Sequence, residues 1–166
     1  GDDSAAIAVL IGAGRTASLV AALEVAVSEL PRAATIREAF AAHGAIIEAD
    51  SIAEALTFAE SYAPEHLLIA TDDAYAVAER VQHAGSIFAG LTSSVVFGDY
   101  ITGANHVLPT AGYARTHSGL STESFMRWTS VQVVDRSAAR RLAPIVGALA
   151  RAEGLDAHER AARLAG

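Results

Sequence analysis

The segment Ala6-Ile7-Ala8-Val9-Leu10-Ile11, followed directly by Gly12-Ala13-Gly14, is a continuous apolar run that ends at a glycine turn. Runs of this kind are typical of β-strands that are buried on both faces of a parallel sheet. Apolar residues at helical spacing follow over residues 17–30, and a second, shorter helix is expected over 35–42. The sequence therefore predicts that the chain opens with one buried parallel strand and two helices.

The alternation of strands and helices continues through the middle of the chain. Ser51 and Glu54 have the spacing of a capping box, which predicts where the next helix begins. Strands that alternate with helices indicate an α/β protein, so we expect an incomplete Rossmann-like, doubly wound parallel sheet. The expected strands are 45–48, 67–70 and 86–88, and the expected helices between them are 51–62 and 72–82.

The C-terminal part has a different composition. Residues 98–121 are rich in Gly, Thr, Asn and Ser, which predicts a long functional loop. A strand is expected at 128–134, followed by a small tail of two helices, one over 137–152 and one that Asp156 caps. We therefore expect a Rossmann-like domain over residues 1–120, part of a larger lobe, and a C-terminal strand and helical tail over 121–166.

Composition excludes several classes of protein. The net charge of −7 and the lack of a Lys/Arg stripe argue against binding to nucleic acid. The longest apolar run is far too short to span a membrane, and no secretory signal is recognisable. The absence of cysteine excludes disulfides, thiolate metal ligands and thiolate nucleophiles, and is compatible with the cytoplasm. The first residue is Gly rather than Met, so an excised piece of a longer protein is one expectation.

The glycine turn at residues 12–17 fits the G-x-G-x-x-A pattern of dinucleotide-binding folds. In those folds an acidic residue closes the next strand about twenty residues further on. Here a second helix occupies that position, and Glu48 lies much further along the chain. We therefore favour an ordinary strand-to-helix turn, and the residues that would contact a nucleotide stay unassigned.

Three of the six histidines lie near acidic residues in segments that contain Gly or Pro. Carboxylate and imidazole groups in loops are suited to general base catalysis and to a site for a hard or borderline metal ion. Each segment also has a simpler explanation, as a solvent-facing loop or as the corner between two helices. The three groupings are Glu65 with His66, Asp99 with His106, and Glu153 with His158.

From residue 45 to residue 158 the chain resembles the histidinol dehydrogenase family, and several independent motifs occur in the family's order. The clearest are Tyr62-Ala-Pro-Glu-His-Leu67, Ala84-Gly-Ser-Ile-Phe88, Gly98-Asp-Tyr100, Asn105-His-Val-Leu-Pro-Thr110 and Glu153-Gly-Leu-Asp-Ala-His158. Ser118-Gly-Leu-Ser121 and Thr129-Ser-Val-Gln132 also match. Residues 1–44 match only in their pattern of elements.

The resemblance implies a zinc-dependent, NAD-linked oxidation of L-histidinol to L-histidine through L-histidinal, the last step of histidine biosynthesis. It implies that Glu65 and His66 are the catalytic acid/base pair, and that Asp99 and His158 are ligands of one zinc ion per site. His66, Asp99, His106, Glu153 and His158 would contact the substrate, with Glu153 holding its imidazole. Without cysteine the aldehyde would be oxidised through its hydrate, with Glu65 activating water and His66 taking the alcohol proton.

The family also implies a homodimer in which the tail that carries Glu153 and His158 completes the neighbour's site. Two departures stand out: the family takes two more zinc ligands from a Q-x-x-H segment just upstream of Gly1, and its members are much longer. We therefore expect the isolated chain to be inactive. The alternatives are a truncated, non-catalytic homologue that acts as a dimerisation or regulatory module, and an enzyme for another polar alcohol.

Overall fold

The computed structural model describes residues 2–165. The chain divides into two compact units, Gly1–Phe125 and Met126–Gly166, and each unit is described by itself. None of the helices within residues 2–165 has the length and apolar character needed to cross a membrane.

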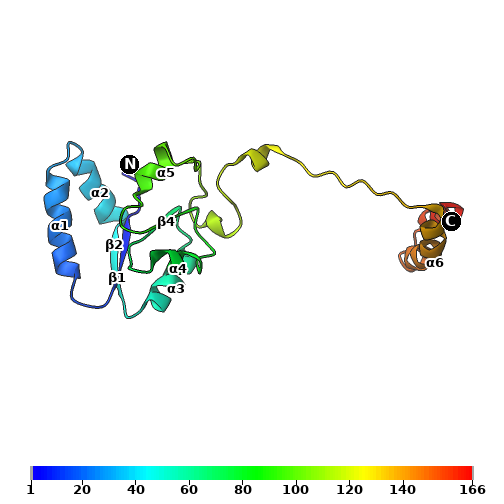
Figure 1. The fold of residues 1–166 in the computed structure, drawn as a ribbon, viewed down its shortest axis with the longest axis horizontal. Coiled ribbons are helices and arrows are strands. Elements are labelled where there is room, and N and C mark those ends of the chain that lie inside the picture. Colours follow the sequence, from blue (N-terminus) through cyan, green and yellow to red (C-terminus); the bar gives the residue numbers. More distant parts are fainter. Residues whose placement is uncertain (1, 166) are drawn as a thin grey trace. The chain divides into compact units, whose positions relative to one another are not determined.

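The first unit alternates parallel strands with helices, which confirms the expected α/β class (Figure 1). Its strands form two separate two-stranded parallel sheets, β1–β2 and β3–β4. In chain order the elements are β1 (Ile7–Ile11), α1 (Thr16–Ser28), α2 (Ala33–His43), β2 (Ala45–Ala49), α3 (Ile52–Tyr62), β3 (His66–Ile69), α4 (Ala74–Ala78), β4 (Ser86–Ala89), α5 (Val95–Tyr100), η1 (Tyr113–Arg115) and η2 (Thr122–Phe125).

Helix α3 begins where the spacing of Ser51 and Glu54 predicted. The Ser51 hydroxyl accepts a hydrogen bond from the Glu54 N–H at 3.2 Å. The Glu54 carboxylate accepts one in turn from the N–H of Asp50, at 2.7 Å, rather than from that of Ser51. Both bonds satisfy backbone donors near the first turn of the helix, where no carbonyl of the helix itself is available.

The core of the first unit gathers beside the β3–β4 sheet. Ile69, Ala74 and Val77 are buried there, and Ile52 and Leu56 of α3 pack against them. Strand β1 was expected to be fully buried, which is wrong: all five of its residues are half-buried. The reason is that β1 is hydrogen-bonded to a neighbouring strand, β2, along only one of its edges.

Three boundaries differ from the expectations for the middle of the chain. His66 is the first residue of β3 rather than a loop residue, and α4 ends at Ala78 rather than near residue 82. Asp99 was expected in a long loop but lies on α5. The turn-rich composition around Gly98 concealed this short helix, because a buried glycine was taken for a loop residue rather than for a point of close packing.

The second unit is a helical hairpin of α6 (Arg136–Ala152) and α7 (Asp156–Ala165). The Asp135 carboxylate caps α6 by accepting from the Ala138 N–H at 2.8 Å. Gly154 has φ +73°, so a glycine suits the left-handed turn that ends α6, as expected. Asp156 is the first residue of α7 rather than its cap, and Glu159 pairs with Arg151 of α6.

The strand expected at residues 128–134 is wrong. This segment is extended, but it is part of no β-sheet among the described residues. Trp128 is 99% exposed and Val133 is 90% exposed. Alternating apolar residues favour a strand only when a partner strand and a covering layer are present, and this unit supplies neither.

Candidate active site

A sharp reversal after α3 brings Glu65 and His66 to the start of β3. Ala63 ends the helix in the left-handed conformation, with φ +52°, and is only 1% exposed. Its N–H still donates to the Ala59 carbonyl at 2.8 Å. Pro64 follows and cannot continue the helix, so the chain leaves α3 and enters β3 within a few residues.

The backbone before His66 is held by the start of β4. The Gly85 N–H donates to the Pro64 carbonyl and the Ser86 N–H donates to the Glu65 carbonyl, each at 2.9 Å. A Cβ atom at residue 85 would lie 2.6 Å from the Glu65 carbonyl oxygen, which is closer than real atoms come. Glycine at 85 is therefore what allows the two strands to begin side by side at Glu65 and His66.

The imidazole of His66 rests on the ring of Phe88, with ring centres 6.0 Å apart and planes inclined by 29°. Gly98 of α5 lies against the same Phe88 ring, because a Cβ there would come within 2.6 Å of Phe88 Cε1. The close approach of helix and ring places the next residue of α5, Asp99, beside His66. Phe88 and Gly98 thus position two polar groups that are 33 residues apart in sequence.

His66 lies between two carboxylates. Its Nε2 atom is 3.4 Å from Asp99 Oδ1 and its Nδ1 atom is 3.9 Å from Glu65 Oε1. The side chains are 27% exposed for His66, 32% for Asp99 and 37% for Glu65, so all three can be reached from solvent. The Nε2 atom itself is buried and has no hydrogen-bond partner among the described residues.

An imidazole nitrogen without a hydrogen-bond partner can take a proton from a hydroxyl group that comes within hydrogen-bond distance of it. A buried polar atom without a hydrogen bond is costly, and such atoms are typical of sites that a ligand completes. Glu65 lies on the other side of the ring and is the most exposed of the three side chains. The cluster therefore has one group suited to accept a proton inside the site and one that can act on water.

The glycine turn after β1 is closed by the chain's own carboxylate. Glu48 Oε1 accepts hydrogen bonds from the Thr16 hydroxyl at 2.6 Å and from the Gly14 N–H at 3.2 Å. The Thr16 and Gly14 hydrogen bonds hold the pKa of Glu48 below its ordinary value. Glu48 is 34 residues from Gly14, but the parallel pairing of β1 with β2 brings it to the turn, which its distance in sequence concealed.

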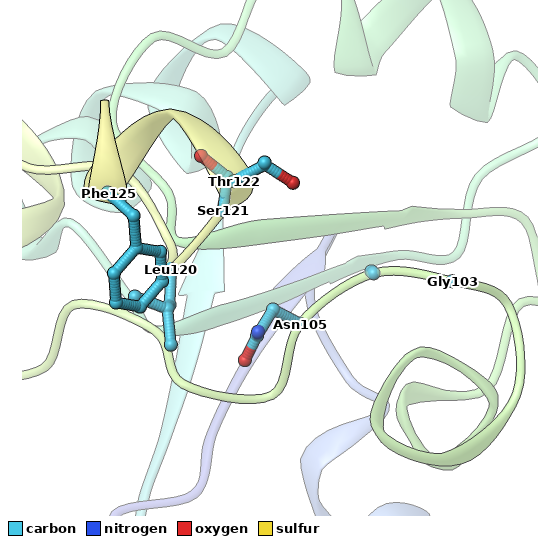
Figure 2. A pocket seen from close by; sticks show the side chains of 7 residues that line it. Gly103, Asn105, Leu120, Ser121, Thr122 and Phe125 are labelled. Atoms are coloured by element: carbon cyan, nitrogen blue, oxygen red, sulfur yellow. The ribbon is translucent and has the colours of Figure 1, made fainter. Parts of the chain in front are cut away.

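His106 lies in the segment between α5 and η1, and no hydrogen bond or ion pair among the described residues joins it to His66. Its neighbour Asn105 accepts from the Val107 N–H at 2.8 Å, a turn held by a side-chain amide. Figure 2 shows the Asn105 side chain facing the Phe125 ring across a pocket of about 610 Å³. Gly103, Leu120 and Thr122 also line this pocket.

Glu153 and His158 belong to the second unit. Glu153 caps the end of α6, and His158 lies in the first turn of α7, where its N–H donates to the Leu155 carbonyl at 3.0 Å. Within residues 2–165, the part that the structure describes, no three His, Asp or Glu side chains gather closely enough to hold a metal ion. The first unit brings Glu65, His66 and Asp99 together, although these three do not form a group that could hold a metal ion. In the second unit, Glu153 and His158 share one helical corner.

The sequence did not indicate the residues that support the site. Phe88 was expected only as a strand residue and Gly98 only as a turn residue. Arg115 also lies next to the site, where its guanidinium donates to the carbonyls of Ser61, near the end of α3, and Gly112. The signal that was available is that Phe88 and Gly98 belong to two of the sequence motifs, Ala84-Gly-Ser-Ile-Phe88 and Gly98-Asp-Tyr100. The second of these motifs also carries Asp99.

The chain is similar to known proteins in both sequence and structure. Residues 1–165 match the sequence profile of the family described as "Histidinol dehydrogenase". Histidinol dehydrogenase of Methanothermobacter thermautotrophicus is 48% identical over 129 residues, which are 78% of this chain and 30% of that protein. The chloroplastic histidinol dehydrogenase of Oryza sativa subsp. japonica is 40% identical over 165 residues, 99% of this chain and 35% of that protein.

A solved structure is also similar. The crystal structure of histidinol dehydrogenase from Elizabethkingia anophelis superimposes with a TM-score of 0.93 at 33% sequence identity. The match covers 99% of this chain and 38% of that one. The chain thus spans about a third of the length of the curated relatives that it matches.

Proposed function

Because the chain belongs to the histidinol dehydrogenase family, we propose that it carries the acid/base part of an enzyme that oxidises L-histidinol to L-histidine through L-histidinal. The reaction is the last step of histidine biosynthesis, and we place it in the cytoplasm. The observation that carries the proposal is the position of His66 between Glu65 and Asp99, with a buried Nε2 atom that has no hydrogen-bond partner among the described residues.

In this proposal His66 accepts the proton of the substrate's alcohol at Nε2, the buried ring nitrogen beside Asp99. The second oxidation starts from the hydrate of the aldehyde, and none of the 166 residues is a cysteine that could form a thiohemiacetal instead. Glu65, the most exposed of the three groups, takes a proton from the attacking water. NAD supplies the hydride acceptor for both oxidations, and its contacts stay unassigned.

Asp99 and His158 are donors of the types that zinc binds in proteins without thiolates. The described residues gather no three such donors, so we propose that Asp99 and His158 supply only part of the ligand set of one zinc ion per site. A zinc ion held there would orient the substrate through its nitrogen atoms. Glu153 accepts a hydrogen bond from the substrate's imidazole, and His106 lies near the substrate.

Glu153 and His158 lie in a different unit from Glu65 and Asp99. We propose that the protein acts as a homodimer and that the second unit of one subunit completes the site of the other. Exposed apolar side chains on α6, among them Ile145 at 59% and Leu149 at 62%, are available for burial against a partner.

The proposal is tested by exchange. The matching segment of the Elizabethkingia anophelis enzyme is replaced by this chain, and NADH formation from L-histidinol is measured with zinc present. We expect the exchange enzyme to turn over at about 1 per second or faster, the range of ordinary dehydrogenases. A folded, dimeric exchange enzyme that oxidises other polar alcohols but not histidinol would overturn the substrate assignment.

The 166-residue chain alone is expected to show no NADH formation above background, because its described residues do not complete a zinc site. The assay uses the same substrate, NAD and zinc as for the exchange enzyme. Turnover of the isolated chain at about 1 per second would show that these 166 residues suffice for the reaction.

A further inference from the structure

Glu60 carries a negative charge at the end of a helix where the helix itself does not favour one. It lies in the last turn of α3, and the dipole of a helix stabilises acidic groups near the first turn and basic groups near the last. Its side chain is only 27% exposed, so the charge is partly withdrawn from water as well. The contacts of this carboxylate, rather than the preferences of the helix, therefore have to explain its position.

Both oxygens of the Glu60 carboxylate are bonded to residues 82–86, which lead the chain into β4 and which we call the entry segment. Oε1 accepts from the N–H of Gln82 at 2.7 Å and, less closely, from that of His83 at 3.4 Å. Oε2 lies 2.8 Å from His83 Nδ1. An ionised carboxylate can only accept, so the imidazole donates through Nδ1. Successive backbone N–H groups around one anionic oxygen form a small nest, and Glu60 fills it.

The entry segment is bonded at its other end to the backbone beside His66. The Gly85 N–H donates to the Pro64 carbonyl and the Ser86 N–H donates to the Glu65 carbonyl, each at 2.9 Å. Pro64 and Glu65 follow the end of α3 directly, so the same short stretch of chain that carries Glu60 also supplies these two carbonyls. Two pieces of chain are thus joined at both of their ends.

We call this closed ring of hydrogen bonds between residues 60–65 and the entry segment the clamp. In the entry segment only Ala84 separates the residues that bind Glu60 from the residues that bind the two carbonyls. A connection of one residue transmits displacement, because it has too few rotatable bonds to absorb it. Release of the entry segment at Glu60 is therefore expected to loosen its hold on the backbone at Glu65.

The α3 side of the clamp is held independently of Glu60. The Ala63 N–H donates to the Ala59 carbonyl at 2.8 Å, and the Arg115 guanidinium donates to the Ser61 carbonyl. Neither of these bonds involves the entry segment. Loss of the Glu60 carboxylate should consequently free the entry segment while the end of α3 stays in place.

The clamp acts on the backbone from which the proposed acid/base side chains extend. The Glu65 carbonyl belongs to the peptide that joins Glu65 to His66, so its hydrogen bond fixes the plane from which both side chains leave. His66 is also the register partner of Ser86, and its imidazole rests on Phe88, two residues further along β4. A displacement of a reacting group by about 1 Å can lower a rate by about 10²-fold.

We infer that Glu60 is a positioning residue for Glu65 and His66. By binding the N–H groups of residues 82 and 83 and the imidazole of His83, it holds Gly85 and Ser86 against the backbone of the dipeptide. The inference rests on the acid/base roles proposed above for Glu65 and His66. Glu60 acts through the entry segment alone, because both of its oxygens are bonded there.

The catalytic test uses the exchange enzyme. Glu60→Ala should lower kcat by about 10- to 100-fold, because both proton-transfer groups are misplaced. It should leave the KM for histidinol nearly unchanged, because the groups proposed to hold the substrate are elsewhere. Glu60→Gln keeps an oxygen that accepts from the two N–H groups, so it should recover most of kcat. An unchanged kcat, or a rise in KM alone, in folded Glu60→Ala enzyme would overturn the inference.

Glu54→Ala is the matched control at the opposite end of α3. The Glu54 carboxylate accepts from the Asp50 N–H at 2.7 Å, so its removal also takes a bond between a side chain and the backbone away from this helix. Glu54→Ala should lower the urea midpoint as Glu60→Ala does, but should keep kcat. Equal falls in kcat for the two variants would overturn the inference, because general weakening of α3 would then explain both.

A second measurement does not depend on activity. In the 166-residue chain with Glu60→Ala, hydrogen exchange at the Gly85 and Ser86 amides should become faster by about tenfold or more. The nuclear Overhauser effects between the rings of His66 and Phe88 should weaken. Glu54→Ala and Glu60→Gln should leave both observables close to those of the unsubstituted chain. Unchanged amide exchange and ring contacts in folded Glu60→Ala chain would overturn the inference.

The two measurements separate this inference from the proposed reaction. If the unsubstituted exchange enzyme does not oxidise histidinol, the proposed function fails, and amide exchange and ring contacts decide whether Glu60 holds the dipeptide. If the enzyme is active and Glu60→Ala alters amide exchange but not kcat, the reaction stands and the positioning role is overturned. If Glu60→Ala does not fold, His83→Ala replaces it: it removes only the Nδ1 contact and should shift all three observables less, and the absence of any shift would overturn the inference.

Discussion

Glu65 and His66 are adjacent in sequence but have different surroundings. His66 is the first residue of β3, lies on the Phe88 ring, and has its Nε2 atom beside Asp99. Glu65 precedes the strand and is the more exposed of the two side chains. Neighbouring residues at a strand end point in different directions, which suits the two separate acid/base roles that we propose for this dipeptide.

We expect substitutions of these two residues to slow different half-reactions of the exchange enzyme. His66→Asn should slow oxidation of histidinol, because the alcohol loses its proton acceptor. Glu65→Gln should chiefly slow oxidation of supplied histidinal, because water is no longer activated. Each loss should be about 10²- to 10⁴-fold in kcat. The measurements are single-turnover NADH traces with each substrate, and small, equal losses on both would indicate a structural role for this segment.

Glu48 gives the first unit a dependence of stability on pH. Its hydrogen bonds from Thr16 and Gly14 lower its pKa in the folded state. A group with a lowered folded-state pKa stabilises the fold above its unfolded pKa, and this stabilisation is lost as pH falls through the folded-state pKa.

Glu48→Gln should therefore unfold at lower urea concentration than the unsubstituted chain at pH 7. The gap between the two midpoints should shrink as the pH is lowered below the ordinary pKa of a glutamate, about 4.3. Glu38→Gln on α2 is the matched control, because Glu38 is exposed and makes no hydrogen bond or ion pair with the described residues, and it should show no such gap. A gap for Glu48→Gln that stays constant from pH 7 to pH 3 would contradict the proposed role of the charge.

At the scale of the elements, the contact between α5 and β4 builds the site. Gly98 allows α5 to lie directly on Phe88, and Asp99 follows it on the helix. On the other side, Arg115 donates to the Ser61 carbonyl near the end of α3, where carbonyls lack partners within the helix. The segment that carries Glu65 and His66 is therefore positioned by packing against one helix and by capping of another.

Gly98→Ala should separate α5 from β4. The added Cβ would lie 2.6 Å from Phe88 Cε1, so the ring or the helix must move. We expect a loss of about 1–3 kcal/mol in the free energy of unfolding, measured with urea, despite the better helix propensity of alanine. Phe88→Leu in the same chain should recover part of this loss, because the smaller side chain makes room.

Gly147→Ala is the control for the same substitution where space is available. A Cβ at Gly147 of α6 would have its nearest neighbour, Glu159 Cγ, at 3.5 Å, an ordinary contact. It should stabilise the α6–α7 hairpin by about 0.5–1 kcal/mol, since alanine favours a helix. If Gly98→Ala were as stabilising as Gly147→Ala, the packing of α5 on Phe88 would not be tight in solution.

At the scale of the whole molecule, the groups assigned to one chemistry lie in two units. Glu65, His66 and Asp99 are in the first unit, and Glu153 and His158 are in the second. The first residues of the second unit, before α6, carry exposed apolar side chains, including Trp128 and Val131. Exposed apolar side chains in an extended connection are typical of surfaces that are covered in an assembly.

A site shared between subunits predicts complementation. Exchange enzymes with Asp99→Ala and with His158→Ala should each be inactive, and their mixture should regain activity after the subunits exchange. Half of randomly mixed dimers contain both variants, and one of their two sites has both residues intact, so about a quarter of full activity is expected. Verified exchange of subunits without any rescue would place Asp99 and His158 in the same subunit's site or in no common site.

The sequence by itself determined the class of the fold and the family. The apolar runs, the helical spacing and the capping residue Ser51 are local signals, because they depend on neighbours within a few residues. The motifs around Glu65, Asp99 and His158 are likewise continuous in sequence, so the family resemblance was visible without coordinates, and the profile match over residues 1–165 confirms it.

Only the tertiary structure decided which of these groups meet. It placed Glu48 at the glycine turn, Asp99 on a helix beside His66, and Phe88 beneath the imidazole. It also left residues 128–134 without a partner strand and joined Glu60 to the segment that leads into β4. These contacts join residues far apart in the chain, and pairing and burial depend on the partners that the whole fold supplies rather than on local preference.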